Sequence, residues 1–249
     1  MPYDPARYWD ERLRGDFSLR GVGHHLYSES YNRWLYRAKR RALRAVLPRP
    51  QPGERALDVG SGTGWVLAEL ARAGWSADGC DISPYAVEQL RERFPDREVF
   101  RYQLGADQLP RADQSIQLVT LLDVAYHVMS DDEWRRGVRD LARVLAPGGS
   151  LVVVDRLGST TVSVEEHVRF RSLDSWTSVL GAPFLLRELR PALRWLSRDP
   201  DTGALRRWRP RLRGAVEYAL DRAIPREPHL RIARFERTGS AAGPHREMR

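Results

Sequence analysis

The sequence predicts an α/β protein with a doubly wound, mostly parallel sheet. Two observations lead to this prediction. From residue 55 onward short apolar runs alternate with amphipathic segments, and the first run leads directly into a glycine-rich loop, residues 60–64. Strands that alternate with helices at this spacing are typical of a parallel sheet covered by helices on both faces. The chain has 249 residues, 42% of them hydrophobic, which is enough for one large core.

The predicted elements follow from the spacing of apolar residues. Two helices are expected first, at 5–14 and 29–47, and Pro48 and Pro50 end the second. The alternation then predicts strands at 55–59, 75–80, 98–102, 116–122 and 150–155, with helices at 64–73, 84–93 and 131–145. Beyond residue 155 we expect a helix at 165–180, a strand or helix at 184–189 and a last strand at 229–235.

The same pattern divides the chain into segments. We expect residues 1–50 to form a helical lid and substrate cap, and residues 51–237 to form the α/β domain, with a substrate-side insertion at about 190–228. Small and charged residues at 238–249 predict a disordered tail. The first residues lack the layout of a signal peptide, and no apolar run reaches the ~18 residues of a membrane span, so we expect a cytoplasmic protein.

A single cysteine limits the metal chemistry that the chain can support. Cys80 alone cannot form an intramolecular disulfide, a zinc site made of thiolates or an iron–sulfur cluster. The sequence also shows no evident cluster of metal-binding residues, and we expect activity that needs no metal ion.

The glycine-rich loop indicates a ligand at the first strand–helix turn, because glycines let a ligand approach the backbone at a helix N-terminus. The loop has no Lys-Ser/Thr after its last glycine, and its spacing differs from that of dinucleotide-binding loops. Asp58 would repel a pyrophosphate but attract a sulfonium or ammonium group. Asp81 follows at the end of the next predicted strand, where a carboxylate can accept from both hydroxyls of a ribose.

Four segments in this order resemble the class I S-adenosylmethionine-dependent methyltransferases, of the type that acts on small molecules. These are Leu57-Asp58-Val59-Gly60-Ser61-Gly62-Thr63-Gly64, Asp81, Leu122-Asp123-Val124-Ala125-Tyr126-His127 and Leu145-Ala146-Pro147-Gly148-Gly149-Ser150-Leu151. The resemblance implies a Rossmann-like sheet of seven strands in the order 3-2-1-4-5-7-6, with only strand seven antiparallel. It also implies S-adenosyl-L-methionine as cofactor.

The resemblance assigns the cofactor-binding residues: Tyr8, Asp58, Gly60, Ser61, Gly62, Gly64, Asp81, Ile82, Ala106, Asp107 and Leu122. Two positions depart from the family. Gly105 occupies the place of an acid, which leaves the amino group of adenine to Asp107 or to the backbone alone. Gln117 stands where the family has aspartate, and this affects a structural hydrogen bond.

Histidines are the candidate proton acceptors. His127 follows the fourth predicted strand, at the sheet edge where open α/β folds bind ligands, and it is the first candidate for a general base. The alternative is that His127 orders the cofactor pocket without moving protons. His24 is the second candidate, and Arg20 or His24 would line the substrate pocket. Weaker candidates are His25, Tyr126 and His167. Asp123, or a backbone carbonyl near Leu122, would accept from the amino group of the methionine moiety.

An arginine-rich stretch suggests how the acceptor is chosen. Residues 187–213 hold nine arginines against three acidic residues, and leucines recur among them at helical spacing. Such a segment fits a membrane surface, an anionic substrate, nucleic acid, or only a solvated face. We expect methyl transfer to an O, N or C atom of a small organic acceptor, anionic or lipid-like ones included, by a monomer or homodimer. The alternative is an RNA methyltransferase that uses residues 187–213.

Overall fold

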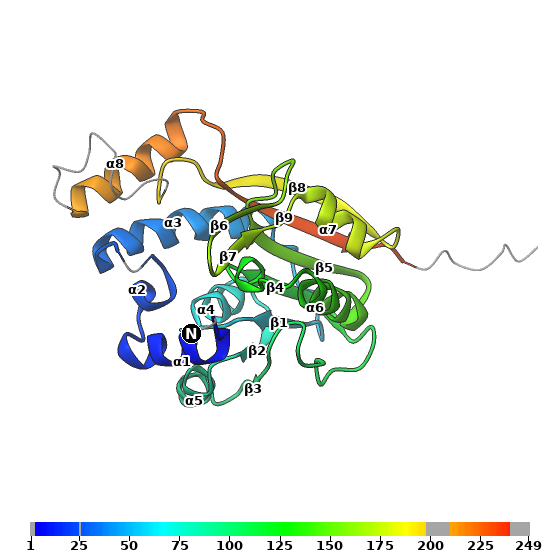
Figure 1. The fold of residues 1–249 in the computed structure, drawn as a ribbon. Coiled ribbons are helices and arrows are strands. Elements are labelled where there is room, and N and C mark those ends of the chain that lie inside the picture. Colours follow the sequence, from blue (N-terminus) through cyan, green and yellow to red (C-terminus); the bar gives the residue numbers. More distant parts are fainter. Residues whose placement is uncertain (1–2, 25, 198–209, 240–249) are drawn as a thin grey trace, which may run out of the picture.

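A seven-stranded sheet forms the centre of the protein (Figure 1). The structure is a computed structural model, and it describes residues 3–24, 26–197 and 210–239. The strands lie in the order β3-β2-β1-β4-β5-β9-β8, and β9 runs antiparallel to both of its neighbours. The sequence-based order and polarity are confirmed. The bounds are β1 Arg55–Val59, β2 Ser76–Asp81, β3 Val99–Arg101, β4 Ile116–Leu122, β5 Leu145–Asp155, β8 Phe184–Leu193 and β9 Leu230–Arg237.

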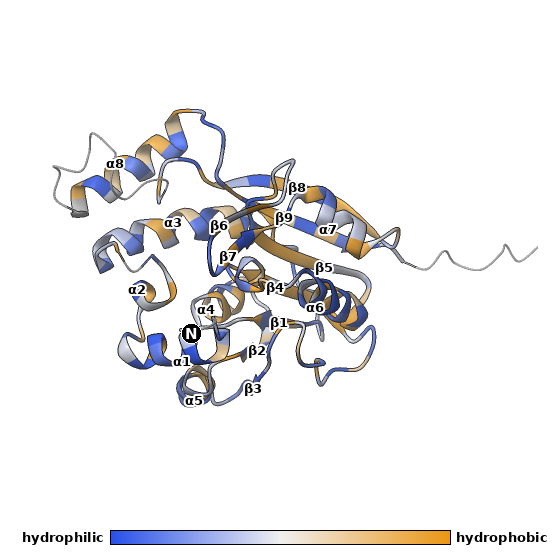
Figure 2. Ribbon diagram, viewed as in Figure 1, coloured by the Kyte–Doolittle hydropathy of each residue, from blue (hydrophilic) through white to orange (hydrophobic). Residues whose placement is uncertain are grey.

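Helices cover both faces of this sheet. They are α1 Pro5–Gly15, α2 Leu19–Val22, α3 Glu29–Val46, α4 Trp65–Arg72, α5 Pro84–Arg93, α6 Asp131–Val144, α7 Leu173–Leu180 and α8 Pro210–Ala223, with a short 3-10 turn, η1 Ala125–His127. One hydrophobic core joins α3, α4 and α5 to one face, and a second joins α6 and α7 to the other. Figure 2 shows the apolar residues concentrated in the central strands, whereas the helices carry both kinds of residue.

The two cores are separate because neighbouring residues of a strand face opposite sides. In β5, Val152 and Val154 join the core with α3 and α4, and Leu151 and Val153 join the core with α6 and α7. A strand that is covered on both faces reads as a continuous apolar run, which is why Leu151 to Val154 was readable as a strand.

The N-terminal segment has two parts with different packing. Helices α1 and α2 lie over the carboxyl edge of the sheet, whereas α3 is a core helix: Leu35, Ala38, Ala42 and Leu43 are buried against the sheet. The third helix is therefore not part of a detachable cap. Its long apolar face can be buried only against the sheet, so it belongs to the α/β core.

Helix α8 lies along α3 and does not cover the ligand cavity described below (Figure 1). Arg213 donates to Glu217 at 2.7 Å within α8, and the hydroxyl of Tyr31 on α3 donates to the same carboxylate. Within the described residues, the segment expected as a substrate-side insertion thus packs on a helix. The sixth strand also continues to Leu193, three residues beyond the expected start of the insertion at 190.

The expected helix at 165–180 is wrong in its first part. Residues 165–172 form part of a hairpin, β6 Val162–Glu165 and β7 Val168–Phe170, and α7 begins only at Leu173, where Ser172 caps it. The β-branched valines of this hairpin favour strand conformation. The segment at 184–189, expected as a strand or a helix, is a strand: Leu185, Leu186 and Leu189 lie in β8, an edge strand whose backbone groups pair with β9.

The departure at Gln117 leaves a structural hydrogen bond in place. The backbone N–H of Arg55 donates to Gln117 Oε1 at 2.9 Å, which joins the first residue of β1 to β4. An amide oxygen can accept from this N–H as a carboxylate would. No helix within the described residues has the length and apolar character to cross a membrane.

Candidate active site

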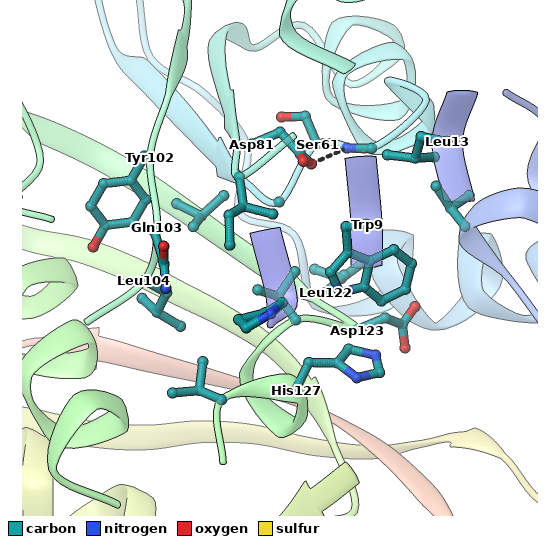
Figure 3. A pocket seen from close by; sticks show the side chains of 18 of the residues that line it. Trp9, Leu13, Ser61, Asp81, Tyr102, Gln103, Leu104, Leu122, Asp123 and His127 are labelled. Atoms are coloured by element: carbon teal, nitrogen blue, oxygen red, sulfur yellow. Dashed lines mark hydrogen bonds between the residues drawn. The ribbon is translucent and has the colours of Figure 1, made fainter. Parts of the chain in front are cut away.

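A cavity of about 300 Å³ lies at the carboxyl edge of the sheet, beneath the N-terminal helices (Figure 3). Its floor comes from the residues that follow β1, β2, β3 and β4, and its roof comes from α1, α2 and α3. The lining residues are Tyr3, Pro5, Trp9, Leu13, Val22, Tyr36, Val59, Gly60, Ser61, Gly62, Thr63, Trp65, Val66, Asp81, Ile82, Tyr102, Gln103, Leu104, Leu122, Asp123, Val124, His127, Val128, Met129, Ser130 and Glu133.

The glycine-rich loop turns sharply from β1 into α4. Gly60 and Gly62 have φ values of 75° and 51°, a region that disfavours side chains. The Gly60 N–H donates to the Cys80 carbonyl at 2.8 Å, and the Gly62 N–H donates to Asp81 Oδ2 at 2.8 Å. The loop is therefore anchored to the end of β2, and its backbone forms one wall of the cavity.

Asp81 is held in one orientation at the end of β2. Its second oxygen, Oδ1, accepts from the Ser83 N–H at 2.9 Å. Burial raises the pKa of this carboxyl, while the backbone donors act in the opposite direction. Each carboxylate oxygen has two lone pairs, so both oxygens retain one for a ligand hydroxyl. This arrangement fits the two hydroxyls of a ribose.

Asp58 lies buried behind the loop and does not line the cavity. Thr120 donates to Asp58 Oδ1 at 2.7 Å, and Oδ2 has no hydrogen-bond partner among the described residues. Burial raises the pKa of Asp58 to about 7. A buried carboxylate oxygen without a partner is costly, and a nearby cation offsets that cost.

The roof of the cavity is attached to the floor. Trp9, Leu13 and Val22 line it from above, and Asp10 accepts from Ser83 Oγ at 2.7 Å and from the Tyr85 N–H at 3.0 Å. Ser83 also caps α5, so the first helix is fixed to the helix that follows β2. A ligand in this cavity would be shielded from water by α1.

The turn after β4 carries a buried ion pair. Asp123 has a φ of 61°, and its Oδ2 lies 2.5 Å from Lys39 Nζ of α3. The Tyr126 hydroxyl donates to Asp123 Oδ1 at 3.1 Å. Both carboxylate oxygens thus have partners from the protein, and the charge of Asp123 is compensated. No lysine or arginine of the described residues lines the cavity.

His127 is fixed in one tautomer. Its Nδ1 lies 3.0 Å from the backbone oxygen of His167, between β6 and β7. Since a carbonyl oxygen can only accept, Nδ1 carries the hydrogen and Nε2 keeps a lone pair. Burial lowers the pKa of His127 to about 4, so the ring is neutral near neutral pH. The edge of the Trp9 ring packs against it, with the ring centroids 5.0 Å apart.

The opposite end of the cavity is formed by the segment after β3 and the start of α6. Tyr102, Gln103 and Leu104 lie on one side of Asp81, and Trp9 and Leu13 lie on the other (Figure 3). Asp107 does not line the cavity, because its Oδ2 accepts from the Gln103 N–H at 2.8 Å within its own loop. Ala106 does not line it either.

The structure brings eight of the expected site residues to the cavity: Gly60, Ser61, Gly62, Asp81, Ile82, Leu122, Asp123 and His127. The others lie outside its lining: Tyr8, His24, Asp58, Gly64, Ala106 and Asp107. The Tyr8 hydroxyl accepts from Arg12 at 2.8 Å, and the His24 N–H donates to Asn32 at 3.0 Å. His25 lies outside the described residues.

Several lining residues were missed by sequence reasoning, among them Trp9, Leu13, Val22, Tyr36, Gln103 and Glu133. The spacing of Trp9 and Leu13, one helical turn apart, was a usable signal for a shared face of α1. Gln103 and Glu133 carry no local signal, since only the packing of α6 on the segment after β3 brings them together.

Residues 57–153 match a family model described as a methyltransferase domain. This part of the chain is similar to that domain, and the strand order of the sheet is the one that the resemblance to the class I S-adenosylmethionine-dependent methyltransferases implies. S-Adenosylmethionine is the cofactor of class I methyltransferases, and Asp81, which lines the cavity, fits its ribose.

Two curated relatives are similar to part of this chain. A demethylmenaquinone methyltransferase of Corynebacterium glutamicum is 34% identical over 105 residues, which are 42% of this chain and 43% of the relative. A 27-O-demethylrifamycin SV methyltransferase of Amycolatopsis mediterranei is 35% identical over 143 residues, 54% of this chain and 51% of the relative. The chain thus spans about half the length, or less, of these curated relatives.

Solved structures share the fold over most of the chain. A possible histamine N-methyltransferase of Thermotoga maritima gives a TM-score of 0.59 at 15% identity, covering 93% of this chain and 99% of the other. The N-methyltransferase NodS of Bradyrhizobium japonicum, solved with S-adenosyl-L-homocysteine, gives 0.58 at 15% identity, covering 94% and 99%. At this identity the likeness shows the fold alone.

Proposed function

We propose that the protein transfers the methyl group of S-adenosylmethionine to an oxygen, nitrogen or carbon atom of a small, uncharged acceptor. One observation carries the proposal: a single cavity contains the glycine-rich loop and Asp81 at one wall and the free Nε2 of His127 at another. A cofactor site and a proton acceptor that share one chamber are what methyl transfer to a weakly acidic group requires.

The charge of the chamber supports an uncharged acceptor. No basic side chain of the described residues lines it, and Lys39 compensates Asp123. An anionic acceptor would find no cation to pair with, and burying an unpaired charge is costly. The aromatic rings of Tyr3, Trp9 and Tyr36 line the chamber and favour a flat apolar body. The expected anionic acceptor is therefore not part of this proposal.

The chain's own residues bind the cofactor, orient the acceptor and exclude water from the chamber. S-Adenosylmethionine, when bound, supplies an electrophilic methyl group on a sulfonium. Asp81 would hold the ribose hydroxyls, and Asp58 would attract the cationic end. The helix α1 excludes water from the chamber through Trp9 and Leu13. His127 Nε2 accepts the proton that the acceptor loses, while Nδ1 stays bonded to the His167 carbonyl.

The arginine-rich stretch does not favour an RNA substrate in the part that the structure describes. Arg187 pairs with Glu236 at 3.0 Å and Arg190 with Glu188 at 2.9 Å, and Arg213 pairs with Glu217. Phosphate binding needs cations that are free to pair. Residues 198–209 lie outside the described residues. The similarity to methyltransferases of small molecules supports the same choice.

Calorimetric titration with S-adenosyl-L-homocysteine tests the cofactor. We expect micromolar binding by the wild type, binding at least about tenfold weaker by Asp81→Ala, and none of NADH. Transfer of a labelled methyl group then tests the acceptor, with ethylphenol, tyramine and hydroxyphenylacetate as probes that share a ring and hydroxyl but differ in charge. Ethylphenol should be methylated fastest. A wild type that binds no S-adenosyl-L-homocysteine would contradict the function, and preference for hydroxyphenylacetate would contradict the uncharged acceptor.

A further inference from the structure

We propose that Glu133, at the start of α6, binds the exocyclic amino group of adenine in the cofactor. This inference rests on the proposed function, because it requires that the cavity bind S-adenosylmethionine. In the family that the sequence resembles, an acid in the segment after β3 has this place, but here Gly105 stands there. The inference therefore assigns recognition of the base to α6.

The packing of α6 explains why position 105 cannot carry an acid. Gly105 has a φ of 83°, and a Cβ atom there would lie 2.5 Å from the carbonyl carbon of Glu133. Arg136 Nε also donates to the Gly105 carbonyl at 3.0 Å. At Gly137, one turn further along α6, a Cβ atom would lie 2.6 Å from Leu104 Cδ1. The first turns of α6 therefore occupy the space that a side chain at position 105 would need.

The same close approach brings Glu133 to the cavity. Glu133 lines the end that also contains Tyr102, Gln103 and Leu104. In Figure 3 this end lies across Asp81 from Trp9 and Leu13. If Asp81 holds the ribose and Asp58 attracts the cationic end, the base of the cofactor points away from the glycine-rich loop. Glu133 is then the acid at the base end.

Three acidic residues line the cavity: Asp81, Asp123 and Glu133. Of these, Glu133 is the one whose carboxylate has no hydrogen-bond or ion-pair partner among the described residues. Asp81 accepts from two backbone N–H groups, and Asp123 is paired with Lys39 and Tyr126. No hydrogen bond or ion pair to the Glu133 carboxylate occurs within the described residues, and the side chain is half-buried. Asp107, the candidate from sequence, is bonded to the Gln103 N–H.

A carboxylate at this position favours adenine over its deaminated counterpart, hypoxanthine. The exocyclic amino group of adenine donates hydrogen bonds, and a carboxylate only accepts them. Hypoxanthine carries an oxygen at the same position, which a carboxylate would repel, whereas a glutamine side chain can donate to it. A carboxylate at the third residue of a helix also stabilises the helix N-terminus. Stabilisation of the helix by Glu133 does not depend on which base is bound. Two ligands that differ only in the base therefore distinguish base recognition from helix stabilisation.

The test is calorimetric titration of the full chain with S-adenosyl-L-homocysteine and with S-inosyl-L-homocysteine. Wild type, Glu133→Gln and Asp107→Asn are compared, the last as a matched change of carboxylate to amide at a neighbouring position. We expect the wild type to prefer the adenine ligand at least about tenfold, Glu133→Gln to lose most of this preference, and Asp107→Asn to keep it. Thermal unfolding should show that both variants fold.

The outcomes distinguish this inference from the proposed function. If the wild type binds S-adenosyl-L-homocysteine and Glu133→Gln discriminates between the ligands as the wild type does, Glu133 does not read the base. Loss of discrimination in Asp107→Asn would also overturn the inference and return the role to Asp107. If the wild type binds neither ligand, the proposed function itself fails.

Discussion

The ammonium group of Lys39 lies 2.5 Å from Asp123 Oδ2, and this ion pair joins α3 to the turn that carries His127. The side chain of Lys39 is 6% exposed and that of Asp123 is 16% exposed. Lys39 is also the single lysine among 41 lysines and arginines of the chain. Its contact compensates a carboxylate at the wall of the cavity, which leaves that wall without net charge.

Removing the cation should destabilise the protein more than removing both charges. In Lys39→Met the carboxylate of Asp123 loses its partner, and we expect a loss of about 3 kcal/mol in the free energy of unfolding. The double variant Lys39→Met/Asp123→Asn should recover most of it, because no unpaired charge remains and asparagine tolerates the positive φ at position 123. Urea denaturation measures both, with Arg33→Met, from an exposed pair with Glu29, as the neutral control. Equal losses in the single and double variants would contradict this account.

His127→Gln should slow methyl transfer without weakening cofactor binding. The loss of the proton acceptor is expected to lower kcat by about 10²-fold or more, while the affinity for S-adenosyl-L-homocysteine stays the same. Because the pKa of His127 is lowered to about 4, wild-type kcat/KM should stay level from neutral pH into the mildly acidic range and fall only toward pH 4. An inflection near 6.5, the ordinary value for histidine, would show that His127 is not buried as described.

The same shift makes a prediction about stability. The folded state disfavours the charged form of His127, so protons bind the unfolded state first as the pH falls from 6.5 toward 4. Its contribution to stability is therefore complete above 6.5 and is lost below that value. The difference in unfolding free energy between wild type and His127→Gln should shrink as the pH falls through this range.

The contribution of Asp58 to stability should depend on pH in the opposite direction from that of His127. Its pKa is raised from 3.8 to about 7 by burial, so the folded state holds the proton that the unfolded state releases. The wild type thus loses stability as the pH rises from 3.8 to 7, and Asp58→Asn lacks this loss. Denaturation of both proteins across this range should show Asp58→Asn gaining relative stability as the pH rises. A difference that does not change with pH would mean that the carboxyl titrates normally.

Gly105→Ala should lower the free energy of unfolding far more than Gly53→Ala does. The two glycines have nearly equal φ values, 83° and 84°, but a Cβ at Gly53 meets no atom within 4 Å. Backbone strain alone should cost Gly53→Ala about 1 kcal/mol. Gly105→Ala adds the overlap with Glu133, and we expect at least about 3 kcal/mol. Similar losses in both variants would show that α6 moves away from the segment after β3 at little cost.

The sequence by itself determined the sheet and much of its ligand-binding edge. Strands β4 and β5 were readable as apolar runs, because strands buried on both faces are largely apolar. Strands β2 and β3 are less apolar, and the regular alternation of strands and helices placed them. Gly60, Gly62, Asp81 and Leu122 were readable because each lies at the end of a predicted strand or shortly after it. In a parallel sheet the carboxyl ends of neighbouring strands meet at one edge, so local pattern and site position coincide there.

The tertiary structure decided everything that depends on elements far apart in the chain. Lys39 meets Asp123 across 84 residues, and His127 meets the carbonyl of His167 across 40. Glu133 reaches the cavity because two glycines let α6 approach the segment after β3. Periodicity reports which face of a segment is apolar, but it does not report which segment that face will contact. That choice is made by side-chain volume and charge only when the whole core is packed.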